Sequence, residues 1–128
     1  MRVIIAGGRD FRDFDLMIEK CDKFFSKVKT PIVIISGKQR SYDRIKKEFY
    51  GADFLGEEYA KIRGHQVDPF PADWDTHGKA AGMIRNRQML VEGKAQGLIA
   101  FWDGESRGTR NMIDLAIKAG LPVRIVEY

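Results

Sequence analysis

Short apolar runs typical of buried strands alternate along this chain with segments whose apolar residues recur at helical spacing. The expected strands are residues 2–6, 32–35, 66–70, 98–102 and 123–126, and the expected helices are about 13–28, 54–63, 79–92 and 108–119. Strict alternation with right-handed crossovers predicts a parallel sheet that is covered by helices on both faces. We therefore expect an α/β fold of three layers, with a five-stranded sheet in the order 3-2-1-4-5.

The length and composition indicate a single domain that spans residues 1–128. No apolar run approaches the roughly 20 residues that cross a bilayer, and the one cysteine, Cys21, cannot form an internal disulfide. We therefore expect a cytoplasmic protein without a membrane partner. His65 and His77 have no ligand-spaced partner, so no metal site is expected. The net charge of +4 permits an anionic partner but favours a solvated surface over a dedicated nucleic-acid surface.

Two loops rich in small residues follow the first and the fourth expected strands. Gly7-Gly8-Arg9-Asp10 permits close approach of a ligand to the backbone, although the full Gly-x-Gly-x-x-Gly fingerprint is absent. Residues 102–109 lead from a buried strand into a helix, so free N–H groups and the positive end of a helix dipole lie at the strand end. The expected sheet reverses its order between these two strands, and open α/β sheets bind ligands in such a crevice.

The residue types around this crevice suit a sugar phosphate or a nucleotide. Backbone amides, hydroxyls and the Arg85 guanidinium suit a phosphate. Three carboxylates can accept hydrogen bonds from ribose hydroxyls, and a tryptophan, Trp74 or Trp102, can stack on a base. The carboxylates are those of Asp10, Asp53 and Asp103. The candidate ligand-binding residues are Gly7, Gly8, Arg9, Asp10, Ser36, Gly37, Gly51, Asp53, Arg85, Asn86, Asp103, Gly104, Ser106, Arg107, Gly108 and Thr109.

The helix that carries Arg85 is expected to follow an irregular loop at 71–78. Apolar spacing along this helix predicts which residues face the core. They are Ile84, Val91 and either Met83 or Leu90. Arg85 shares a face with Met89, one turn later.

Residues 38–50 form a segment that is too long for an ordinary strand-to-helix loop. It contains five basic residues, two acidic residues and three aromatic residues, and it has room for a helical turn. Basic residues interleaved with aromatic ones can follow a phosphate backbone or stack a base. The alternative, which we favour on the sequence alone, is a surface flap or a contact between subunits.

Five motifs in order resemble the YspA-like branch of the SLOG superfamily, which also contains the LOG phosphoribohydrolases and the DNA-processing protein DprA. The motifs are residues 4–11 (IIAGGRDF), 36–37 with 51–53 (SG, GAD), 70–74 (FPADW), 78–82 with 85–89 (GKAAG, RNRQM), and 100–104 with 106–109 (AFWDG, SRGT). The resemblance implies a Rossmann-like fold, a nucleotide-type ligand, homo-oligomers whose subunits often complete the site, and a phage or bacterial source. The branch itself has no settled activity.

Two departures from the superfamily pattern bear on the activity. In the branch about three residues join Ser-Gly to Gly-Ala-Asp, whereas here residues 38–50 lie between them. The phosphoribohydrolases also pair an Arg ahead of a Met with a Glu three residues after Gly-Thr. Arg85 and Met89 match the first part, but Met112 occupies the Glu position. A thioether cannot act as a general acid or base, so hydrolysis would need Asp10 or Asp103 as a substitute.

These observations favour the binding of a nucleotide or nucleotide-derived phosphate ligand, for sensing or for processing, with no other cofactor expected. Two alternatives stay open. One is N-glycosidic hydrolysis of nucleotides, with Arg85 and Asp103 as the candidate catalytic residues. The other is single-stranded nucleic-acid binding of the DprA type through residues 38–50.

Overall fold

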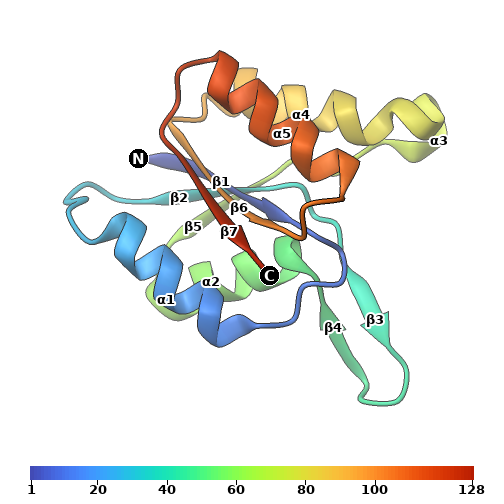
Figure 1. Cartoon of the computed structure of the whole chain (residues 1–128), viewed down its shortest axis with the longest axis horizontal. Coiled ribbons are helices and arrows are strands. Elements are labelled where there is room, and N and C mark those ends of the chain that lie inside the picture. Colours follow the sequence, from blue (N-terminus) through green and yellow to red (C-terminus); the bar gives the residue numbers. More distant parts are fainter.

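The computed structural model describes all 128 residues and contains a five-stranded parallel sheet with helices on both faces (Figure 1). Its strands are β1 (Arg2–Gly7), β2 (Val33–Ser36), β5 (Gln66–Pro69), β6 (Gly97–Trp102) and β7 (Val123–Glu127). They lie in the order β5-β2-β1-β6-β7, and every neighbouring pair is parallel. The expected order 3-2-1-4-5 is therefore confirmed.

The long helices divide between the two faces of the sheet. One face is covered by α1 (Phe14–Phe25) and α2 (Ala52–Arg63), and the other by α4 (Ala81–Val91) and α5 (Arg107–Lys118) (Figure 1). Side chains of successive strand residues point to opposite faces, so β1 and β6 contribute to both cores. The result is the three-layered, Rossmann-like arrangement that the alternating pattern predicts. None of the helices has both the length and the apolar character that a membrane span requires.

Local signals in the sequence set the ends of these helices. Asp13 precedes α1 and its Oδ1 accepts a hydrogen bond from the backbone N–H of Leu16 at 3.0 Å. Gly64 ends α2 in the left-handed conformation with φ of 73°. Cys21 lies on the inner face of α1, and burial raises the pKa of its thiol to about 12, which makes it the inert core residue its position suggests.

Residues 38–50 form a hairpin without a helical turn. Its strands, β3 (Ser41–Asp43) and β4 (Glu48–Tyr50), pair only with each other, and the hairpin projects from the body of the molecule (Figure 1). The segment 71–78 is also more ordered than the sequence indicates. It contains α3 (Trp74–His77), capped by Asp73, and a short 3₁₀ helix (Gly78–Ala80) follows.

The prediction of which residues of α4 face the core is wrong for Ile84 and Val91, and of the two alternatives only Leu90 packs, partly buried, against the core. The buried residues of α4 are Ala81, Arg85, Asn86 and Met89, whereas Met83 and Val91 are exposed and Ile84 is half-buried. Apolar spacing assigns the inward face to the most hydrophobic stripe. Here the inward stripe contains a guanidinium and an amide, and the pattern therefore misses it. Burial of two polar side chains on one helix face indicates a site between α4 and the sheet.

Candidate functional site

A cavity of about 440 Å³ opens where the strand order reverses, between the carboxyl ends of β1 and β6. These two strands pair directly up to Gly7 and Phe101, and the N–H of Gly8 donates to the Phe101 carbonyl at 3.0 Å. The loops that follow β1 and β6, both rich in small residues, therefore begin side by side, as the sequence predicts. The lining residues are Ala6, Gly7, Gly8, Arg9, Asp10, Gln39, Asp53, Trp74, Lys79, Gly82, Met83, Arg85, Asn86, Met89, Asp103, Ser106, Gly108, Thr109 and Met112.

Gly7 ends β1 at a position where the neighbouring elements leave no space for a side chain. A Cβ at this position would overlap the carbonyl oxygen of Phe101 and would lie 2.8 Å from the Cβ of Ala52. The close packing of β1 against β6 and α2 at the cavity edge therefore depends on this glycine.

Gly7→Ala is expected to lower the free energy of unfolding by about 2 kcal/mol, because the backbone of β6 must move to admit the methyl group. Gly108→Ala is the matched control. A Cβ at Gly108 meets nothing within 4 Å, and its helical position gains about 1 kcal/mol from alanine. Chemical denaturation of both variants measures the difference, and equal midpoints would contradict the packing argument.

Arg85 is the most heavily buried cation of the cavity, at 9% exposure. Its Nη1 donates to the carbonyl of Gly37 and lies 3.9 Å from Oδ2 of Asp53. Its Nε is buried without a hydrogen-bond partner. Burial lowers the pKa of Arg85, and Asp53 opposes that shift. A buried guanidinium with an unpartnered donor costs free energy until an acceptor completes its shell.

Asp53 lies in the first turn of α2 and faces Arg85. Its Oδ2 accepts from the N–H of Gln39 at 3.1 Å, whereas its Oδ1 makes no hydrogen bond within the protein. Burial raises the pKa of Asp53 to about 6, although Arg85 and the Gln39 N–H act in the opposite direction. The cavity therefore contains a carboxyl group that changes its charge close to neutral pH.

Asp103 organises the opposite wall. Its Oδ1 accepts from the N–H groups of Glu105 and Ser106 at 2.9 and 2.8 Å, and these bonds hold its pKa below the usual range. Ser106 in turn caps α5 and accepts from the N–H of Thr109. Asp103 is thus an ionised loop anchor and acceptor, and the geometry does not support it as a general acid.

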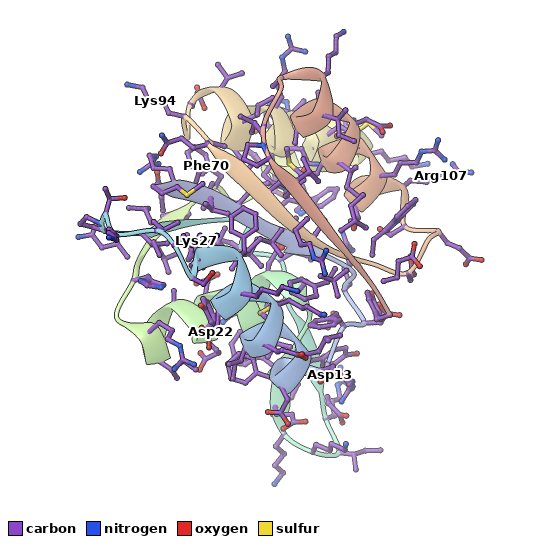
Figure 2. The ribbon with its side chains drawn as sticks, turned by 60° about the vertical axis from the view of Figure 1, so that its left-hand side comes forward. Asp13, Asp22, Lys27, Phe70, Lys94 and Arg107 are labelled. Atoms are coloured by element: carbon purple, nitrogen blue, oxygen red, sulfur yellow. The ribbon has the colours of Figure 1, made fainter.

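Three backbone N–H groups of the same loop already donate to acceptors within the protein, so they are not free to bind an anion. The N–H groups of Arg107 and Gly108 remain without such acceptors in the first turn of α5. Gly108 lines the cavity, whereas the Arg107 side chain is exposed on the outside of the ribbon (Figure 2). One free amide at a helix start can therefore face a ligand.

Asn86 braces α4 against α5. Its Nδ2 donates to the carbonyl of Gly108 and to Oδ1 of Asn111, both at 3.1 Å. The amide nitrogen is therefore used within the protein, and only its Oδ1 is left for a ligand.

Trp74 and Arg9 form one lip of the cavity. Trp74 comes from α3, is 43% exposed, and its ring centroid lies 5.6 Å from Cζ of Arg9. Of the two tryptophans considered for base stacking, only Trp74 lines the cavity. Trp102 instead donates through Nε1 to the carbonyl of Ser106 at 3.0 Å and fixes the loop.

The structure brings most of the candidate ligand residues to the cavity, although five of them lie outside its lining. The candidates that line it are Gly7, Gly8, Arg9, Asp10, Asp53, Arg85, Asn86, Asp103, Ser106, Gly108 and Thr109. Those that lie outside the lining are Ser36, Gly37, Gly51, Gly104 and Arg107. Ser36 is buried and donates to Glu57 at 2.8 Å, Gly37 accepts from Arg85, and Gly51 precedes α2 with φ of 108°.

Sequence reasoning missed several lining residues, among them Gln39, Lys79, Gly82 and Met83. Lys79 and Gly82 fall within a motif that carries the family resemblance, and this motif could have identified them. Gln39 lies in the insertion, where no motif pointed to it. Met112, which the resemblance aligns with the glutamate of the phosphoribohydrolases, lies fully buried at the cavity wall. No group of three or more His, Cys, Asp or Glu side chains lies close enough together to hold a metal ion.

Comparisons with known proteins find one family relationship. No protein-family model and no solved structure matches the chain. A protein described as "Gene 61 protein" from Mycobacterium phage D29 is 33% identical over 127 residues, which cover 95% of this chain and 93% of the phage protein. Such similarity along nearly the full length of both chains places them in one family. The chain therefore belongs to the family of the Gene 61 protein of Mycobacterium phage D29.

Proposed function

We propose that this protein binds a nucleotide or a nucleotide-derived phosphate in the cavity between β1 and β6. The observation that carries the proposal is Arg85, a buried guanidinium with an unpartnered Nε and an Nη2 that makes no hydrogen bond within the protein. A phosphate supplies several acceptor oxygens, and a planar guanidinium can donate to two of them at once. Arg9 and Lys79 add positive charge at the same cavity.

The remaining groups suit the sugar and the base. Asp10 and Asp53 place carboxylate oxygens at the cavity, where they can accept from ribose hydroxyls. Trp74 presents a half-exposed ring at the lip, where a base can stack. The volume of about 440 Å³ lies in the range of small-molecule sites. The resemblance to the SLOG superfamily supports the same class of ligand, and its subunit arrangement makes a homo-oligomer part of this proposal.

Met112 favours binding without N-glycosidic hydrolysis. It occupies the position where the phosphoribohydrolases have a glutamate, and its thioether neither donates nor takes up a proton. Asp103 is a poor replacement, because two backbone N–H groups hold its pKa below the usual range, so it has no proton to donate and is a weak base. Sensing or carrying a nucleotide-type ligand is therefore the form of the proposal that the residues support best.

Isothermal titration calorimetry tests the proposal with a nucleoside, its mono- and diphosphate, ribose 5-phosphate and inorganic phosphate. We expect at least one phosphate ester to bind about tenfold or more tightly than the matching nucleoside, because a hydrogen bond to a charged group contributes about 1.5–3 kcal/mol. Equal affinity for the nucleoside and its phosphates, or no heat from any of them, would overturn the proposal.

A further inference from the structure

The hairpin β3–β4 is a fixed arm that projects from the body (Figure 1). Its four-residue tip is held by Asp43, whose Oδ1 accepts from the N–H groups of Ile45 and Lys46 at 2.9 and 3.0 Å. Lys47 closes the turn with φ of 54°. These bonds give the tip a defined conformation.

The inner face of the hairpin is attached to the body through Arg12. Its guanidinium carbon lies 3.7 Å from the ring centroid of Tyr50, and its Nη1 lies 3.1 Å from Asp43 and 3.9 Å from Glu48. Ser41 also donates from its hydroxyl to the carbonyl of Arg9 at 3.0 Å. The arm therefore has a set direction, and both of its acidic residues are already paired.

The tip is consequently cationic. Arg44, Lys46 and Lys47 are exposed and form no ion pair, and Ile45 between them is 93% exposed. The other face of the ribbon carries Tyr42 and Phe49, which pack on each other at 4.9 Å. The Phe49 ring also lies 5.6 Å from the ring of Phe54 in α2, and Arg40 stacks 4.4 Å from the Phe49 ring centroid. The arm thus combines an exposed aliphatic side chain at its tip, several unpaired basic side chains and a two-stranded backbone.

We propose that this hairpin is a binding arm for double-stranded DNA, separate from the nucleotide cavity. A two-stranded ribbon fits the major groove of B-DNA. The cations beside the tip can contact phosphates on the groove walls, and a single aliphatic side chain at the tip can contact base steps, as apolar wedges do in proteins that enter grooves. Charge complementarity favours a polyanion over a second copy of this chain, because two such tips repel each other.

Fluorescence anisotropy of a labelled 20-base-pair DNA duplex, measured at several salt concentrations, tests whether this arm binds DNA. The double variant R44A/K46A should weaken binding roughly tenfold or more at low salt. The plot of log affinity against log salt should become shallower by about 2, since each phosphate contact contributes about 0.9 to its slope. The control K27A/K29A removes the same charge from exposed positions beyond the far end of α1, where Figure 2 labels Lys27, and should leave both values unchanged.

Ile45→Ala tests whether the apolar tip contributes to duplex binding in addition to the charges beside it. We expect it to weaken duplex binding severalfold with an unchanged salt slope, because it removes an apolar contact and no charge. Arg87→Ala should bind the duplex like the wild type, since Arg87 is exposed on α4, away from the hairpin and outside the cavity lining. An equal loss in K27A/K29A, tighter binding of a single strand of the same length, or no duplex binding by the wild type would overturn the proposal. The proposal would also be overturned if analytical ultracentrifugation showed that Ile45→Ala disrupts self-association while duplex binding stays unchanged.

Discussion

Arg85→Ala should weaken the binding of a nucleotide phosphate by about 100-fold, whereas Arg87→Ala should leave it within about twofold. The 100-fold change corresponds to about 2.7 kcal/mol, the contribution of one or two hydrogen bonds to a charged group. Arg87 is the matched control because it comes from the same helix, is exposed, and lies outside the cavity lining. Calorimetry at one fixed salt concentration measures both variants.

Arg85→Lys tests whether the shape of the guanidinium matters as well as its charge. A lysine keeps the positive charge but loses the planar fork, so we expect it to recover only part of the affinity. Thermal unfolding of each variant checks that the fold persists, since Arg85→Ala also removes the hydrogen bond to the Gly37 carbonyl. Equal losses for Arg85→Ala and Arg87→Ala would show that net charge, and not the buried guanidinium, determines binding.

The sheet and its crevice were predictable because their signals are local and repeated. Leu98 and Ile99 belong to a continuous apolar run that is typical of a strand covered on both faces. Gly7 and Gly8 follow a similar run, and the topology rule for alternating strands and helices then brings the two exits together. These predictions require no knowledge of side-chain packing.

The inward face of α4 was not predictable from apolar spacing because the site itself breaks the pattern. Arg85 and Asn86 are buried because Arg85 lines the cavity and Asn86 bonds to α5. A pattern based on hydrophobicity assigns such polar residues to the surface. The contact of Arg12 with Tyr50, which orients the hairpin, joins residues that are far apart in the chain. Pairings of this kind depend on the tertiary structure, and the local sequence carries no signal for them.

Asp53→Asn should make the protein more stable at pH 8 and should flatten the dependence of stability on pH between about 4 and 7. The unfolded chain releases the Asp53 proton near the ordinary pKa of 3.8, whereas burial raises the pKa to about 6 in the folded state. The stability that this proton contributes is therefore fully present below about pH 4 and is lost as the pH rises through 6. The loss amounts to about 3 kcal/mol, at about 1.4 kcal/mol for each pKa unit.

Asp103→Asn provides a control of opposite sign. Hydrogen bonds from the N–H groups of Ser106 and Glu105 lower the pKa of Asp103, so its stabilising contribution is present above about pH 4 and is lost as the pH falls. Urea denaturation of both variants from pH 3 to 8 separates the two groups. Asp53→Asn should diverge from the wild type as the pH rises toward 7, and Asp103→Asn should converge with it as the pH falls. If Asp53→Asn instead followed the wild-type profile at every pH, Asp53 would not be the buried, titrating partner of Arg85.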